Sequence, residues 1–166
     1  MNARTLKQHL KYIVPEIRLA LIREPGAKPL AVRCPEDLEK FVEPMKWYDI
    51  EKFVCFHCNA RNEVTGYVII SQGTVSASLV HPREVFKSAI LNNAHAVIVA
   101  HNHPAGSLIP SREDRDTTEQ LIAAGRLLGI EVLDHVIVAA SGILSLREAE
   151  PASGSSAECR QQENRR

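Results

Sequence analysis

Aromatic residues are scarce in this 166-residue chain, and long apolar runs and a net charge of either sign are absent. Phe, Trp and Tyr make up 5% of the residues, and Trp47-Tyr48 is too little aromatic surface for a platform that stacks nucleic-acid bases. No apolar run approaches the roughly 18–20 residues that span a bilayer. The N-terminus also lacks the apolar segment and small-residue cleavage site of a secretory signal. We therefore expect no association with membranes.

The charges balance, with 20 Lys+Arg against 20 Asp+Glu, which excludes bulk attraction to nucleic acid or to an anionic membrane. The balance hides two unlike parts. Residues 1–33 hold seven basic and two acidic side chains, whereas residues 34–149 hold ten basic and fifteen acidic ones. The basic segment is typical of a solvated face, and it leaves a contact with DNA open.

The four cysteines (Cys34, Cys55, Cys58 and Cys159) are scattered and form no disulfide framework, so free thiols in the cytoplasm are expected. Cys55 and Cys58 form one CxxC pair without a second pair. In a strand the two thiols would face opposite ways, which disfavours a zinc site at this pair.

The chain is long enough for one domain with its own core. We predict three parts: a basic N-terminal extension over 1–33 with a helix at 4–13 and a strand at 16–24, a domain over 34–149, and a small, polar, disordered tail over 150–166. Apolar periodicity predicts the elements of the domain. They are a helix starting at Cys34-Pro35, a hairpin of strands 51–58 and 67–71, a helix over 82–92, a strand over 95–100, a helix over 111–128, and strands over 130–140 and 143–146. Interleaved strands and helices indicate an α/β fold around one sheet.

The stretch VIVAHNHPAGSLIPSRED, residues 97–114, carries the chemistry. His101 and His103 are two residues apart at the end of an apolar strand, so both imidazoles project on the same side, as two ligands of a zinc site would. Asp114 is the candidate third ligand. It lies on the packing face of the helix that follows, where a buried carboxylate needs a partner, and the helix N-terminus helps to keep it ionised. The other members of that face are Thr118, Leu121, Gly125 and Leu128, and the face predicted for helix 82–92 is Val85, Phe86, Ala89 and Ile90.

Each residue also has a structural interpretation. Ser111-x-x-Asp114 fits a reciprocal helix cap, and the two histidines fit plain loop residues. Ser111 can serve both purposes, since its backbone can cap the helix while its hydroxyl reaches a substrate. His81 and Glu84 are predicted to cap or pair locally at a helix start, and His135 to be a satisfied strand-end histidine.

HNHPAG followed by PSREDRDTT resembles the JAMM motif, in which HxHP is followed after six residues by SxxD. GTVSASLVHPREVFKSAI, the helix SREDRDTTEQLIAAGRLLGI and EVLDHVIV are similar, in that order, to the RadC-like branch of the JAB/MPN domain family, over about residues 40–148. The resemblance implies an MPN domain, with a mixed, curved β-sheet flanked by helices as in cytidine deaminases. It implies one Zn²⁺ held by His101, His103 and Asp114, Ser111 stabilising an oxyanion, and hydrolysis of amide or isopeptide bonds. A zinc deaminase is disfavoured, because His101-Asn102-His103 lacks the glutamate of H-x-E.

The chain departs from this pattern at the general base. The resemblance implies a glutamate at the position of Val68, and TGYVIISQGT contains no acid. Glu63 is five residues away and on the opposite face of a continuous strand, so only a bulge or a displaced turn would bring Glu63 or Glu51 to the metal. A missing base costs roughly 10²–10⁴ in rate.

Three interpretations follow from the sequence. The first is a zinc-dependent metallopeptidase-type hydrolase acting on a protein or peptide. The second is a zinc-binding but catalytically silent module that acts through a protein partner, and the third is an accessory protein of DNA repair or mobile DNA.

Overall fold

A computed structural model describes residues 22, 26, 29–73 and 80–149. The predicted helix at 4–13 and the tail at 150–166 lie outside the described residues, as does the predicted strand at 16–24 except for Ile22. Within the described part of the chain, no helix has both the length and the apolar character needed to cross a membrane.

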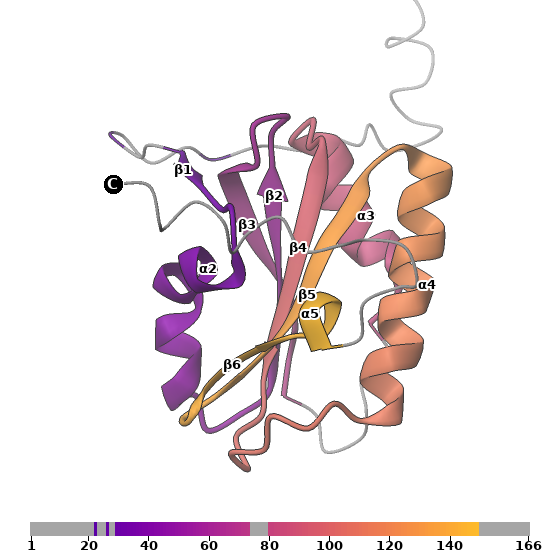
Figure 1. The fold of residues 1–166 in the computed structure, drawn as a ribbon. Coiled ribbons are helices and arrows are strands. Elements are labelled where there is room, and N and C mark those ends of the chain that lie inside the picture. The colour runs from indigo at the N-terminus through magenta and orange to yellow at the C-terminus, as the bar shows by residue number, and fades with distance from the viewer. Residues whose placement is uncertain (1–21, 23–25, 27–28, 74–79, 150–166) are drawn as a thin grey trace, which may run out of the picture.

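Six strands form one mixed sheet in the order β1-β3-β2-β4-β5-β6, and α4 runs alongside it (Figure 1). Only β4 and β5 are parallel, and the other neighbouring strands are antiparallel. The elements are β1 (Leu30–Ala31), α2 (Pro35–Val42), η1 (Glu43–Trp47), β2 (Lys52–Cys58), β3 (Glu63–Gln72), α3 (Pro82–Leu91), β4 (Ala96–Asn102), α4 (Arg112–Leu128), β5 (Glu131–Ala139), β6 (Gly142–Ser145) and α5 (Leu146–Ala149).

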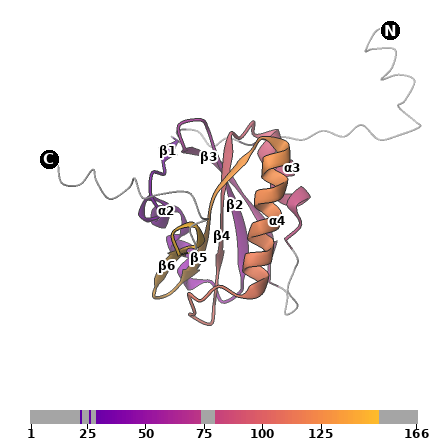
Figure 2. The ribbon, with the colours of Figure 1, turned by 45° about the vertical axis from the view of Figure 1, so that its right-hand side comes forward.

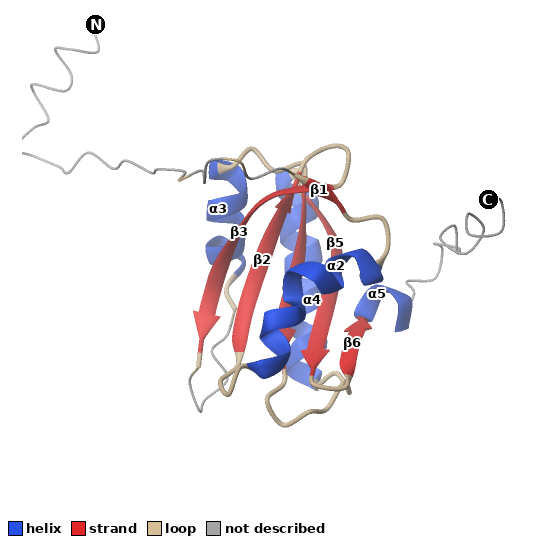
Figure 3. Ribbon diagram, turned by 90° about the vertical axis from the view of Figure 1, so that its left-hand side faces the viewer, coloured by secondary structure: helices blue, strands red, loops and turns tan. Residues whose placement is uncertain are grey.

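Helices cover both faces of the sheet, with α2 on one face and α3 and α4 on the other (Figures 2 and 3). Each face has its own apolar cluster. β4 separates the two clusters and is buried at every position, as expected for a central strand covered on both sides. The C-terminal end of β4 carries His101 of the predicted site, and His103 follows directly after the strand.

The predicted hairpin, helices and later strands are confirmed, with boundaries shifted by a few residues. The prediction that both Leu128 and Ile90 face inward is wrong, because they are 48% and 55% exposed. Leu128 is the last residue of α4, where the chain turns at Gly129, in the left-handed conformation, and leaves the sheet surface. Ile90 lies beyond the edge of the apolar stripe of α3, whose buried residues are Val85, Phe86 and Ala89.

The two thiols of the CxxC pair face opposite sides of the sheet, as predicted. Cys58 belongs to the cluster under α2, and Cys55 belongs to the cluster under α3 and α4. Both thiols are buried, and this burial raises their pKa to about 11 for Cys58 and about 12 for Cys55. The pair is therefore part of the core.

Gly125 allows α4 to approach β5 closely. A Cβ atom at this position would press into the carbonyl oxygen of Ile130 and lie 3.2 Å from Cζ of Phe86. We expect Gly125→Ala to lower the unfolding free energy, because overpacking of about 1–3 kcal/mol exceeds the gain of about 1 kcal/mol in helix propensity. Urea unfolding measures this change. The control is Gln120→Ala on the exposed face of α4, and equal stability of the two variants would contradict the close packing inferred at Gly125.

Candidate metal centre

His101 lies at the end of β4 and is fully buried. The register of β2 and β4 sets it opposite Phe53, and the two rings stack with an interplanar angle of 9° and a centroid distance of 5.9 Å. Its Nδ1 lies 2.8 Å from Nε2 of His135 on β5. The ring is therefore held from two sides, with Nε2 directed to the end of the sheet.

His103 follows β4, where the chain leaves the sheet. Its backbone N–H donates to the carbonyl of Val138, which keeps the residue beside β5. Its Nδ1 lies 2.8 Å from the carbonyl oxygen of Ser107. A carbonyl oxygen can only accept, so Nδ1 carries a hydrogen and Nε2 is the nitrogen left to bind a metal.

Asp114 approaches the two histidines from the first turn of α4. Its Oδ1 lies 3.1 Å from Nε2 of His101, and its Oδ2 lies 3.6 Å from Nε2 of His103. Ser111 is the N-cap of α4, and its hydroxyl and backbone N–H both donate to Asp114 Oδ2 at 2.7 Å, while its Oγ accepts from the Asp114 N–H at 3.1 Å. The predicted reciprocal cap is thus present, and it holds the carboxylate next to the histidines.

Burial alone would raise the pKa of Asp114, but the hydrogen bond and charge of His101 and the two bonds from Ser111 outweigh it. The pKa therefore lies well below that of an ordinary aspartate. Asp114 is ionised at any pH at which the protein would work. The carboxylate is thus an anionic donor at the end of the sheet.

Three donor atoms converge at this point. One ligand atom from each of His101, His103 and Asp114 lies within 4.8 Å of the others. The two Nε2 atoms are 2.9 Å apart. Nitrogen and carboxylate oxygen are both ligands that zinc accepts, and three protein ligands are typical of a catalytic zinc site with an open fourth position. The chemistry of the donor set therefore fits zinc.

Loss of the Ser111 side chain is expected to cost about 0.5–2 kcal/mol of unfolding free energy, because the orphan N–H of Asp114 loses its cap. Chemical denaturation of Ser111→Ala measures this loss. Ser141→Ala, in the turn between β5 and β6, is the control. Coincident unfolding curves for the two variants would show that the cap adds no stability.

Val68, at the position where the resemblance implies a glutamate, lies away from the three ligands His101, His103 and Asp114. Val68 pairs with Cys55, which is two residues further along β2 than Phe53, the partner of His101. Its side chain packs against the apolar cluster under α3 and α4. Glu63 begins β3 at the other end of the sheet, where it accepts a hydrogen bond from Asn59 at 2.7 Å. Neither side chain is directed to the metal ligands.

Glu51 lies at the same end of the sheet as the histidines. It directly precedes β2, and its carbonyl accepts from the N–H of Gly73 at 2.8 Å. The next residue, Lys52, is tied to the end of β4, because its N–H donates to Oδ1 of Asn102 at 2.8 Å. Since Phe53 pairs with His101, the register continued by two residues sets Glu51 opposite His103. Its side chain is exposed.

His135 is the site residue that sequence analysis missed. The prediction that His135 is hydrogen-bonded is confirmed, with His101 and Thr118 as partners, but the prediction that it lies at a strand end is wrong, because it lies in the middle of β5. Burial, and next the neighbouring His101, lower the pKa of His135 to about 3, so the ring is neutral at neutral pH. The signal available in the sequence is one histidine directly before the apolar run at 136–139 of the same strand.

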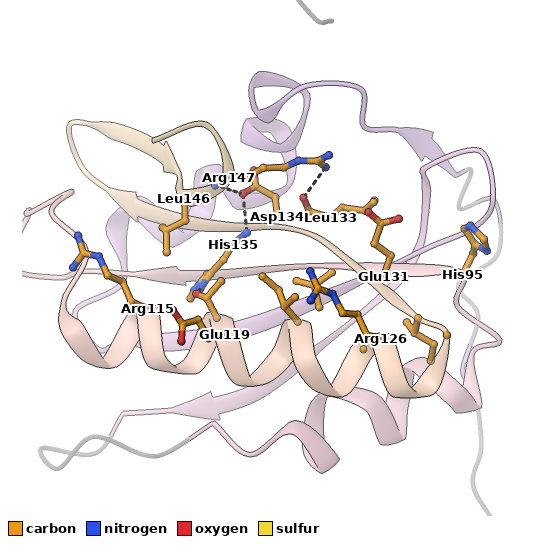
Figure 4. Close-up of a pocket in the computed structure, with 16 residues that line it drawn as sticks. His95, Arg115, Glu119, Arg126, Glu131, Leu133, Asp134, His135, Leu146 and Arg147 are labelled. Atoms are coloured by element: carbon orange, nitrogen blue, oxygen red, sulfur yellow. Dashed lines mark hydrogen bonds between the residues drawn. The ribbon is translucent and has the colours of Figure 1, made fainter. Parts of the chain in front are cut away.

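Figure 4 shows His135 directed toward α4, whereas Asp134 points to the other side of β5, toward Arg147. His135 and Thr118 also line a groove of about 750 Å³ between α4 and β5. None of the three converging ligands lines this groove. The groove is therefore separate from the three candidate ligands and is lined by the residues that support His101, namely His135 and Thr118.

A family model described as the RadC-like JAB domain matches residues 32–151. The chain is also similar to UPF0758 proteins of bacteria. It is 53% identical over 115 residues to one from Symbiobacterium thermophilum (69% of this chain and 49% of that protein). It is 48% identical over 118 residues to one from Geobacillus thermodenitrificans (70% and 52%). It is 40% identical over 134 residues to one from Bacillus cereus (80% and 60%). The chain spans about half the length of the first two of these relatives.

Proposed function

Because the chain belongs to the RadC-like JAB domain family, we propose that it is a zinc-dependent hydrolase of the metallopeptidase type that acts on amide or isopeptide bonds of a protein or peptide. The observation that carries this proposal is the convergence of His101, His103 and Asp114 at the open end of β4. When bound, zinc would supply Lewis-acid polarisation of a carbonyl and make a water molecule more acidic.

The side chains around the ligands have defined roles in this proposal. Glu51 takes the proton from the attacking water, since the register sets it opposite His103 and its carboxylate is exposed at the same end of the sheet. Ser111, whose exposed hydroxyl donates to Asp114 Oδ2 at 2.7 Å before substrate binds, turns that hydrogen to the oxyanion that develops on the substrate. Glu51 thus replaces the acid that the resemblance implies at Val68.

A second candidate function is a zinc-binding module without turnover that acts through a protein partner. The position of Val68 in an apolar cluster favours it, because a glutamate implied there is replaced by a core residue. Contact with DNA through residues 1–33 stays a prediction, since most of that segment lies outside the described residues. A cytoplasmic location, proposed from the sequence, is supported by the free thiols of Cys34, Cys55 and Cys58.

Zinc titration of the purified chain, followed by an assay on a panel of peptide and isopeptide substrates, tests the proposal. One zinc per chain and turnover that a chelator abolishes are expected. The absence of zinc binding would refute both candidate functions, whereas zinc binding without turnover on any substrate would favour the silent module.

A further inference from the structure

We propose that His135, supported by Thr118, is a positioning residue that holds His101 in the tautomer whose Nε2 lone pair faces the metal. The inference rests on the metal site proposed above and deepens it. It is carried by a chain of short hydrogen bonds behind His101 that leads from β4 through β5 to α4.

The direction of this chain follows from its last member. Oγ1 of Thr118 lies 2.6 Å from the backbone carbonyl oxygen of Asp114. Neither a peptide carbonyl nor any other group there can supply a hydrogen to that contact, so the threonine hydroxyl donates it. The hydroxyl has one hydrogen, and Oγ1 must therefore accept in its second contact, with Nδ1 of His135 at 2.6 Å.

The assignment then passes through both rings. Nδ1 of His135 carries a hydrogen. The ring is 1% exposed and neither of its hydrogen-bond partners is an acid, so its Nε2 is an acceptor. The partner of that Nε2 is Nδ1 of His101 at 2.8 Å, which must donate. With Nδ1 of His101 engaged in this way, Nε2, which lies 3.1 Å from Asp114 Oδ1, is the nitrogen left to bind a metal.

The same result holds for the second histidine by a different route, since the carbonyl of Ser107 fixes the hydrogen of His103 on Nδ1. Both imidazoles thus direct Nε2, the nitrogen available to a metal, to the point that Asp114 approaches. Outer hydrogen-bond partners of this kind fix the tautomer and the ring orientation of metal-binding histidines. His135 is 1% exposed, so water does not compete with it as the hydrogen-bond partner of His101.

The geometry also links the ligands to one another. Thr118 donates to the carbonyl of Asp114, whose own side chain is the third ligand. The backbone of one ligand therefore determines, through Thr118 and His135, the tautomer of another ligand. The site is pre-organised by these contacts within the fold.

The test compares two replacements of His135. In His135→Gln the amide oxygen can still accept from His101, whereas in His135→Leu nothing can. We expect the Leu variant to bind Zn²⁺ about 10–100-fold more weakly in a competition with a chelating dye, and the Gln variant to stay close to the wild type. The absorption spectrum of the Co²⁺-loaded proteins reports the ligand geometry in the same variants.

A second readout separates positioning from a merely structural role. Nitrogen-15 NMR of the imidazoles in the zinc-loaded protein is expected to show His101 bound through Nε2 with its hydrogen on Nδ1 in the wild type and in His135→Gln, and a fraction of unbound His101 in His135→Leu. If His135→Leu does not fold, Thr118→Val, which removes only the hydroxyl, is measured instead and is expected to show the same direction of change.

A loss of thermal stability in His135→Leu with unchanged zinc affinity and an unchanged His101 tautomer would overturn the inference. A His101 that keeps its hydrogen on Nε2 in the zinc-loaded wild type would also overturn it. Neither readout depends on turnover, so failure of the hydrolase proposal is distinguished from failure of this one.

Discussion

His103→Ala is expected to abolish tight zinc binding. The replacement removes one of three converging donors and leaves His101 and Asp114, which are too few for a stable site. Loss of an outer partner already costs 10–100-fold in affinity, and loss of a ligand is expected to cost more than about 100-fold. Zinc competition with a chelating dye and metal analysis of the purified variant measure the change.

The matched control is His95→Ala. His95 directly precedes β4 at the opposite end of the strand, and its side chain is exposed. Its loss removes one imidazole without touching the cluster, so full zinc affinity is expected. Equal zinc content in the two variants would refute the metal centre, because binding would then depend on some other group of the chain.

Glu51→Gln is expected to lower turnover by roughly 10²–10⁴ while zinc stays bound, because the amide cannot take a proton from the attacking water. The physical reason for choosing Glu51 is its register opposite His103 at the open end of the sheet. The measurement is kcat on any peptide or isopeptide that the wild type cleaves, together with the zinc content of the variant.

Glu63→Gln is the control for this second prediction. Glu63 lies at the far end of β3 from the candidate metal centre. At the usual rise per residue it is about 26 Å along the strand from Ser71, which pairs with Phe53, the partner of His101. It is hydrogen-bonded to Asn59, a contact that glutamine can keep. Turnover of Glu63→Gln equal to the wild type, with Glu51→Gln impaired, is the expected pattern. The reverse pattern, or equal effects, would remove Glu51 from the proposed mechanism.

The second candidate function, a zinc-binding module without turnover, predicts a different result for the same variants. If the chain acts only through a partner, Glu51→Gln changes neither zinc affinity nor any chemical rate, because no rate exists to change. The pair of measurements therefore distinguishes the two candidate functions within one set of proteins. Metal content is the common readout.

Local pattern was sufficient for much of the fold and for the three candidate ligands. A largely apolar run located β2, because a strand covered on both faces is apolar throughout. A helical apolar period located α4, because burial on one face imposes that period on a helix. The HxHP and SxxD spacing identified His101, His103 and Asp114, since two residues along a strand and one helical turn are geometries that sequence alone defines. The failures, Leu128 and Ile90, are at the margin of an apolar stripe, where only the actual packing decides exposure.

Contacts across the sheet depended on the tertiary structure. No spacing along the chain relates His135 to His101, which are 34 residues apart, or Glu51 to His103. The parallel register of β4 and β5 produces the first relation. The antiparallel register of β2 and β4, continued two residues beyond its last pair of Phe53 and His101, gives the second. Such pairings depend on which strands become neighbours, and a one-residue shift in register would move every one of these side chains to the other face.

The sequence by itself thus determined that the chain has a three-ligand motif, little aromatic surface, and no net charge with which to attract nucleic acid. The tertiary structure decided that the three donor atoms converge, that His135 lies behind His101, and that Glu51 precedes a strand at the same end of the sheet. The physical reason is that ligand type follows from residue identity, whereas tautomer and proton transfer follow from hydrogen-bond partners that folding brings from other strands.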